Sequence, residues 1–213
     1  MPPIVSVVGK SKSGKTTLIE KLVGELRLRG YCVATIKHAQ DIDFEPGKDS
    51  WRHLQAGSEA TAISSRDKVV LIKPTAPAAT LDEIARLLGD DYDIILTEGF
   101  KQAKTPKIEV RRRQAGPPLG NIDRVIAIVT DEPIKTKTRK FSTQDVKGLA
   151  DLLEEGFIKP QRNRLTLYIN NAPVPLTVFP RQIISNVLVA MASSLKGVEK
   201  ISSLDIFLRR QPK

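Results

Sequence analysis

The sequence predicts an α/β fold of three layers, in which helices cover a mostly parallel central sheet, with a small ββαβ-like appendage at the C-terminus. Two observations favour it. A strand, a loop, a helix and a second strand follow one another in about 35 residues, the length of one parallel βαβ unit. Short apolar runs then alternate with helical or polar segments up to about residue 155. A chain of 213 residues suits one such domain with a small addition.

The first βαβ unit begins with an apolar, β-branched run at residues 4–8, which is typical of a buried strand. Apolar side chains recur at helical spacing over residues 15–29, and Gly30 is expected to end that helix. The second strand is expected at residues 32–36, where Cys32 is interpreted as a small buried residue.

The rest of the first domain follows the same logic. A polar loop is expected at 37–48, and further strands are expected at 60–64, 69–73, 93–98, 107–110 and 125–129. Helices are expected at 50–56 and 81–88, the second capped by Thr80. A last helix is expected from a cap at Ser142 or Thr143 to about residue 155.

Pro160 marks the expected boundary between a first domain, residues 1–159, and a small module, residues 160–213. The module is predicted to contain a hairpin of residues 165–169 and 174–179 around Asn170 and Asn171, a helix at 183–195 and a strand at 206–208. The chain carries a net charge of +10, of which residues 161–213 hold +6. This module is therefore expected to meet an anionic partner.

Composition excludes several classes of protein. With 40% hydrophobic and 27% charged residues, the chain is neither disordered nor fibrous. No run of about 18 apolar residues predicts a membrane span, and the N-terminus lacks the pattern of a secretory signal, so a cytoplasmic location is expected. The single cysteine excludes an intrachain disulfide. Only 5% aromatic residues make stacking on nucleic acid an unfavoured function.

The clearest motif lies between the first strand and the first helix. It matches G-x-x-x-x-G-K-[ST] and is spelled Gly9-Lys10-Ser11-Lys12-Ser13-Gly14-Lys15-Thr16. In such a P-loop the backbone N–H groups and the helix N-terminus face phosphates. Lys15 would reach the β- and γ-phosphates, and the Thr16 hydroxyl would bind Mg²⁺. The predicted fold is therefore that of a P-loop NTPase.

Acidic residues near the expected strand ends are candidates for the metal and the base. Glu98 ends an apolar strand, at the sheet edge where ligands bind in such folds, and is predicted to contact Mg²⁺. Asp41 or Asp43, in the loop after the second strand, would orient the attacking water or touch the metal, unless both are ordinary solvated carboxylates. Asp131 would contact guanine, or it forms a turn ahead of Pro133.

Several segments together resemble one family. They are the P-loop, Ile36-Lys37-His38, Pro46-Gly47-Lys48-Asp49-Ser50-Trp51-Arg52, Ala56-Gly57, Glu98-Gly99-Phe100-Lys101 and Pro106-Lys107-Ile108-Glu109-Val110. In this order and spacing they resemble the molybdopterin-guanine dinucleotide biosynthesis protein B family, MobB, over about residues 3–155.

The resemblance implies a dimeric P-loop GTPase that binds GTP with Mg²⁺ and hydrolyses it slowly, with the GTP phosphates at Gly9 to Thr17. It implies a role beside a guanylyltransferase of the MobA type, which attaches GMP to molybdopterin, or in delivery of the pterin cofactor. Lys15 and Asp43 would be catalytic, and Thr16, Asp43 and Glu98 would lie near the metal. The accessory or partner-binding residues would be His38, Lys48, Asp49, Arg52 and Lys101.

Three alternatives stay open from the residues. Lys10 is either a lysine that reaches the nucleotide of the partner subunit, as in a related dimeric P-loop class, or a solvent-facing lysine, because that class has Gly-Gly where this chain has Ser11-Lys12. A small-molecule kinase would use Arg111, Arg112 and Arg113 as lid residues, although a solvated loop explains them as well. A non-catalytic adaptor for an anionic partner would explain the charge alone.

Overall fold

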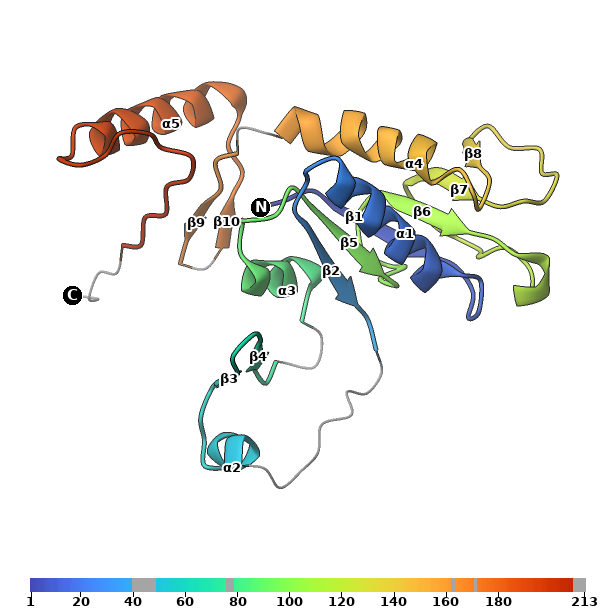
Figure 1. Ribbon diagram of the computed structural model, residues 1–213, viewed down its shortest axis with the longest axis horizontal. Coiled ribbons are helices and arrows are strands. Elements are labelled where there is room, and N and C mark those ends of the chain that lie inside the picture. Colours follow the sequence, from blue (N-terminus) through green and yellow to red (C-terminus); the bar gives the residue numbers. More distant parts are fainter. Residues whose placement is uncertain (40–48, 76–78, 162–163, 171, 209–213) are drawn as a thin grey trace. The chain divides into compact units, whose positions relative to one another are not determined.

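The computed structural model describes the chain except residues 40–48, 76–78, 162–163, 171 and 209–213 (Figure 1). The chain divides into two compact units, Met1–Arg162 and Asn163–Lys213. Nowhere in the described ranges is a helix both long and apolar enough to cross a membrane.

The first unit is built on a parallel sheet of six strands in the order β2-β5-β1-β6-β7-β8. Their bounds are β1 Ile4–Val8, β2 Val33–Lys37, β5 Ile94–Glu98, β6 Lys107–Val110, β7 Val125–Val129 and β8 Arg139–Phe141. The predicted α/β fold with a mostly parallel sheet is confirmed. Because all strands run the same way, their carboxyl ends share one edge, where the loop after β1 and Glu98 of β5 both lie.

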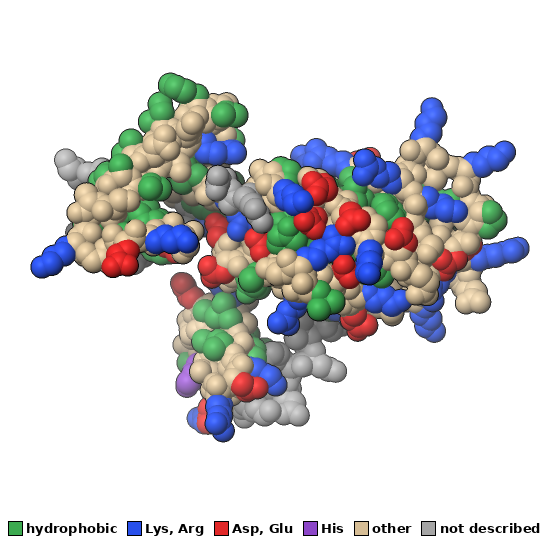
Figure 2. Space-filling view, turned by 45° about the horizontal axis from the view of Figure 1, so that its top comes forward, with side chains coloured by type: hydrophobic (Ala, Val, Ile, Leu, Met, Phe, Trp, Pro, Cys, Tyr) green, Lys and Arg blue, Asp and Glu red, His purple; other side chains and the backbone are tan. Residues whose placement is uncertain are grey.

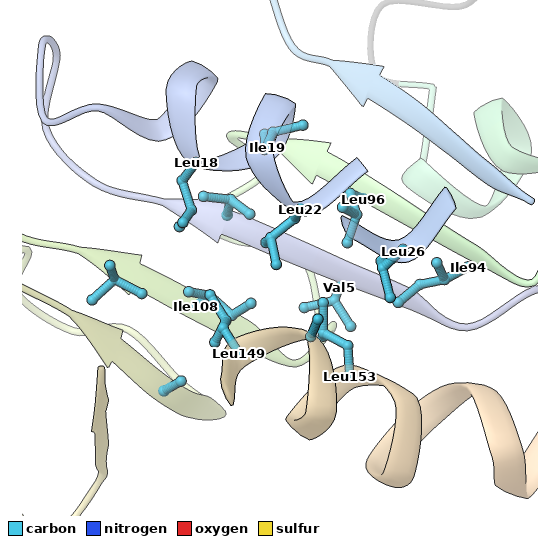
Figure 3. Close-up of a cluster of buried hydrophobic side chains, with 14 of the residues drawn as sticks. Val5, Leu18, Ile19, Leu22, Leu26, Ile94, Leu96, Ile108, Leu149 and Leu153 are labelled. Carbon is cyan, nitrogen blue, oxygen red and sulfur yellow. The ribbon is translucent and has the colours of Figure 1, made fainter. Parts of the chain in front are cut away.

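Helices cover both faces of this sheet. On one face α1 (Lys15–Leu28) and α4 (Val146–Leu153) pack on alternate strand residues, among them Val5, Leu96 and Ile108 (Figure 3). The intervening residues, such as Ile95, point to the other face and meet α3 (Leu81–Leu88). The three layers follow from this alternation of side chains along each strand.

Local signals set most helix ends, and one cap was predicted wrongly. Thr80 caps α3 as expected, with a reciprocal bond between its backbone N–H and Glu83 at 2.7 Å. The cap of α4 is Asp145, whose Oδ1 accepts from the Gly148 N–H at 3.0 Å, and not Ser142 or Thr143. The Thr143 hydroxyl donates to Asp131 instead, so it is not available as a cap.

The remaining elements of this unit are α2 (Asp49–Gln55) and an antiparallel hairpin of β3 (Thr61–Ser64) and β4 (Val69–Ile72). Strand β8 was not predicted, because its Arg-Lys-Phe sequence does not resemble a buried strand. Cys32 is exposed, contrary to the expectation, since it precedes the edge strand β2.

The second unit contains β9 (Leu167–Ile169), β10 (Ala172–Val174) and α5 (Val178–Ser193). The predicted hairpin is present, but the predicted second strand is wrong beyond Val174, because residues from Val178 onward are helical. Pro180 suits the first turn of α5, where its missing N–H leaves no bond unmade. Residues 206–208 form no strand, so the unit is ββα rather than ββαβ. Figure 2 shows hydrophobic side chains open on the surface of α5.

Candidate nucleotide-binding site

Two glycines shape the loop between β1 and α1. A Cβ on Gly9 would lie 2.5 Å from the Val110 carbonyl oxygen and 2.6 Å from Ser13 Oγ, so no larger residue fits there. Gly14 is the N-cap of α1 with φ of 97°, a left-handed conformation that glycine adopts without strain. The loop therefore turns tightly into α1, whose first N–H groups and dipole favour an anion.

Lys15, the first residue of α1, folds back over this loop. Its Nζ donates a hydrogen bond to the Lys10 carbonyl oxygen at 2.8 Å. Burial is the largest influence on the pKa of Lys15 and lowers it, Glu98 raises it, and the cations Lys101 and Lys37 lower it further. A phosphate beside Lys15 would therefore supply the negative charge that this crowded group of cations lacks.

Thr16 and Glu98 lie in direct contact. The Thr16 hydroxyl donates a hydrogen bond to Glu98 Oε2 at 2.9 Å. The loop of residues 9–14 between β1 and α1 is called the phosphate loop below. Glu98 stands opposite Val7 in the β1–β5 register, so the end of β5 places its carboxylate beside this loop. The structure thus brings together the two described residues for which a magnesium role was predicted.

These two oxygen donors suit Mg²⁺, which binds one or two protein groups and completes its shell with phosphate oxygens and water. Within the part of the chain that the structure describes, no group of three or more His, Cys, Asp or Glu residues could hold a metal ion.

The end of β2 adds Lys37 and His38 to the same edge. Lys37 is opposite Glu98 in the β2–β5 register, and the His38 N–H donates to the Glu98 carbonyl oxygen at 3.0 Å. The His38 ring contacts Phe100, with ring centroids 5.2 Å apart. His38 was predicted as a site residue, but Lys37 was not. Its position at the end of β2, the strand beside that of Glu98, is the signal that could have identified it.

The loop after β6 is anchored from beneath by Glu109, which is only 2% exposed. Its Oε2 accepts from Arg111 Nη2 at 2.7 Å, and its Oε1 accepts from the Leu119 N–H at 3.1 Å. The residues of this loop are compatible with a kinase lid or with a solvated segment. In the structure both ends of the loop are tied to one buried carboxylate.

Arg112 extends from the anchored loop to the phosphate loop. Its Nη2, Cζ and Nε lie 3.1, 3.2 and 3.4 Å from the position that a Cβ on Gly14 would take. Sequence reasoning did not place Arg112 at the nucleotide site, because no motif connects it with Gly14. The contact depends on β6 lying next to β1 in the sheet.

Asp131 follows β7 and is bound to the segment after β8. Its Oδ1 accepts from the Thr143 N–H at 2.9 Å, and its Oδ2 accepts from the Thr143 hydroxyl at 2.5 Å. These hydrogen bonds, the hydroxyl first, hold the pKa of Asp131 below its usual value, and the charge of Arg112 adds to the effect. Asp131 is therefore an ionised acceptor at the same sheet edge, and its contact with guanine stays a prediction.

The predicted residues of the segment after β2 are not brought to this cluster by any described contact. Asp41, Asp43 and Lys48 lie outside the described residues. Asp49 and Arg52 form an ion pair with each other on α2, at 3.5 Å and largely exposed. In the phosphate loop and at the start of α1, Ser13 is buried, whereas four other predicted residues are exposed: Lys10, Ser11, Lys12 and Thr17.

Comparison with known proteins agrees with the sequence motifs. Residues 4–131 match the family described as molybdopterin guanine dinucleotide synthesis protein B, MobB. A relative from Haemophilus influenzae named molybdopterin-guanine dinucleotide biosynthesis adapter protein is 36% identical, over 71% of this chain and 88% of its own. One of the same name from Escherichia coli is 37% identical, over 73% and 93%.

A solved structure gives the same result. A crystal structure of molybdopterin-guanine biosynthesis protein B matches 71% of this chain and 97% of its own, with 31% identity and a TM-score of 0.56. The family match over residues 4–131 includes the phosphate loop, Glu98 and Arg112. The chain belongs to the MobB family, as its motifs predicted.

Proposed function

We propose that this chain is an adapter protein of molybdopterin guanine dinucleotide biosynthesis that binds GTP with Mg²⁺ and hydrolyses it slowly. The names of its relatives support the biosynthetic role. The contact between Thr16 and Glu98 beside Lys15 carries the nucleotide part, because it joins a phosphate loop to a carboxylate at the sheet edge. Without such a pairing, the glycine-rich loop alone would indicate only an anion site.

In this proposal the N–H groups of the loop hold the phosphates, and Lys15 exchanges the Lys10 carbonyl for β- and γ-phosphate oxygens. Thr16 and Glu98 would hold Mg²⁺, which would neutralise charge on the phosphates. Hydrolysis adds the oxygen of a water molecule to the γ-phosphorus, breaks its bond to the β–γ bridging oxygen, and yields GDP and phosphate. Asp43 is the residue proposed to orient that water.

Asp131 supplies the base preference in this proposal. An ionised carboxylate accepts hydrogen bonds from the N1 and N2 donors of guanine, whereas adenine offers no matching pair. Asp131→Asn is expected to weaken GTP binding about 10-fold and to leave ATP binding unchanged, so the ratio of the two affinities is the measurement. An unchanged ratio would assign Asp131 to the turn alone.

The partners follow from the biosynthetic role. We propose that the chain acts as a homodimer beside a guanylyltransferase of the MobA type, and that it assists GMP transfer to molybdopterin or delivers the pterin cofactor. Lys48, Asp49, Arg52 and Lys101 are the residues proposed to complete the site or meet a partner. The basic C-terminal module is proposed to contact that enzyme or the anionic pterin.

The proposal is tested by titrating GTP and ATP into the full chain with Mg²⁺ and with EDTA. GTP is expected to bind with Mg²⁺, and Lys15→Ala is expected to weaken its binding about 100-fold, since a charge-assisted contact is lost. Lys73→Ala, which removes an exposed lysine elsewhere, is the control and should change nothing. Equal GTP binding by Lys15→Ala, or ADP release that depends on an added small-molecule acceptor, would contradict the proposal.

A further inference from the structure

The direction in which a nucleotide would leave the phosphate loop follows from the sheet order and rests on the function proposed above. Thr16 and Glu98, which would hold Mg²⁺ beside the terminal phosphates, would place the γ end of a nucleotide on their side of the loop. Glu98 belongs to β5, on one side of β1, whereas β6, β7 and β8 lie on the other. The α-phosphate and the nucleoside therefore extend toward the ends of β6, β7 and β8.

A hollow occupies that side of the phosphate loop. It is lined by Gly14, Thr17, Leu18, Lys21, Val110, Arg112, Val129, Thr143 and Gln144. Lys21 Nζ approaches Gln144 Oε1 at 3.4 Å, which joins α1 to the segment before α4. Asp131, bonded to Thr143, stands next to this wall. The hollow thus has polar groups around a floor of apolar strand and helix residues.

Arg112 forms one wall of the hollow and presents a flat surface. Because Nη2, Cζ and Nε are nearly equidistant from the Cβ position of Gly14, at 3.1, 3.2 and 3.4 Å, the plane of the guanidinium and not its edge faces that glycine. Any side chain at position 14 would disturb this arrangement. The Arg112 side chain is exposed, and the described residues give it no hydrogen bond or ion pair.

A guanidinium that has one face against the backbone and, among the described residues, neither a hydrogen bond nor an ion pair is suited to stacking. Arginine stacks on planar π-systems, and this interaction tolerates any base because every base has a π-face. The bond between buried Glu109 and Arg111 anchors the backbone of the residue that precedes Arg112. The side chain is thereby pre-organised for a ring that enters from the hollow.

We propose that this hollow takes the nucleoside of the bound nucleotide and that its purine ring stacks on the Arg112 guanidinium. Arg112 is then a binding residue of the nucleotide site that acts on the base and not on the phosphates. It raises affinity for any purine nucleotide, whereas Asp131 is the residue proposed to prefer guanine. The two contributions are separable by the choice of ligand.

The test compares GTP, ATP and inorganic tripolyphosphate, each titrated with Mg²⁺ into the full chain. Arg112→Ala is expected to weaken GTP about 10-fold, ATP by a similar factor, and tripolyphosphate less than about 2-fold. Arg112→Lys keeps the charge but loses the plane, so its loss of GTP affinity should match that of Arg112→Ala. Arg113→Ala, the next residue on the same loop, is the control and should bind all three ligands like the wild type.

Three results would contradict the proposed stacking on Arg112. An equal loss for tripolyphosphate, full affinity in Arg112→Lys, or no loss in Arg112→Ala would overturn stacking on Arg112. The conservative lysine variant keeps the test available if the alanine variant unfolds. Wild-type protein that binds neither GTP nor tripolyphosphate would overturn the proposed function as well, whereas normal GTP binding by the Arg112 variants would overturn this inference alone.

Discussion

The two units of the chain differ in how completely their helices are buried. In Met1–Arg162, α1 buries Leu18, Ile19, Leu22 and Leu26 against the sheet. In Asn163–Lys213, α5 has 16 residues and none of them is buried, while Val178 and Phe179 are 79% and 72% exposed. The first unit therefore has a closed core that can hold a nucleotide site rigid. The second unit does not support a site of that kind by its own packing.

The largest effect is expected from a pair of substitutions, one on α1 and one on α5. Leu22→Ala is expected to lower the free energy of unfolding by about 2–5 kcal/mol, because the buried side chain leaves a cavity. Val187→Ala on α5 is expected to change it by less than about 0.5 kcal/mol, since that side chain is 51% exposed. Urea unfolding of the full chain measures both, and equal losses would contradict the comparison.

Within the first unit, Glu98→Gln tests the metal edge. The amide keeps the shape of the side chain and a hydrogen-bonding oxygen but removes the charge that Mg²⁺ requires. We expect GTP affinity in Mg²⁺ to fall about 10-fold or more and affinity in EDTA to stay near the wild-type value. Glu155→Gln, which alters an exposed carboxylate away from the loop, is the control. Loss of GTP affinity in EDTA as well would assign Glu98 a structural role.

A pH experiment sharpens the same comparison through the contact of α1 with α4. Arg29 donates to Glu154 Oε2 at 2.9 Å and, with Lys159 and Tyr31, lowers the pKa of Glu154 to about 2. Because the pKa of Glu154 is lower in the folded state, its charge stabilises the fold above about pH 4.5, and this stabilisation is lost as pH falls toward 2.

Glu154→Gln is therefore expected to be less stable than the wild type at pH 7, and the difference should shrink between pH 4.5 and pH 2. Urea midpoints at several pH values measure this, with Glu199→Gln of the second unit as a control. A difference independent of pH would mean that the charge of Glu154 plays no part.

Local sequence was enough for the phosphate loop and for most of the sheet. The spacing of Gly9, Gly14, Lys15 and Thr16 alone predicted the tight loop between β1 and α1, and Glu98 could be placed because parallel strands end at one edge. Thr80 also caps α3 as predicted, since the capping box is a local pattern.

The predictions that failed concern residues whose partners are distant in sequence. Thr143 could cap a helix, but Asp131 takes its hydroxyl, and Arg112 reaches Gly14 only because β6 lies beside β1. Residues 206–208 have the composition of a strand, yet a strand also needs a neighbour to pair with. Neither kind of information is present in a short window of sequence.

In the function proposed above, the first unit alone binds the nucleotide. Titrations of GTP, with Mg²⁺ and with EDTA, into the full chain and into a chain that ends at Arg162 measure whether it does. We predict Mg²⁺-dependent binding by both, with dissociation constants within about 2-fold of each other. A shortened chain that keeps its cooperative unfolding but loses GTP binding would contradict the claim.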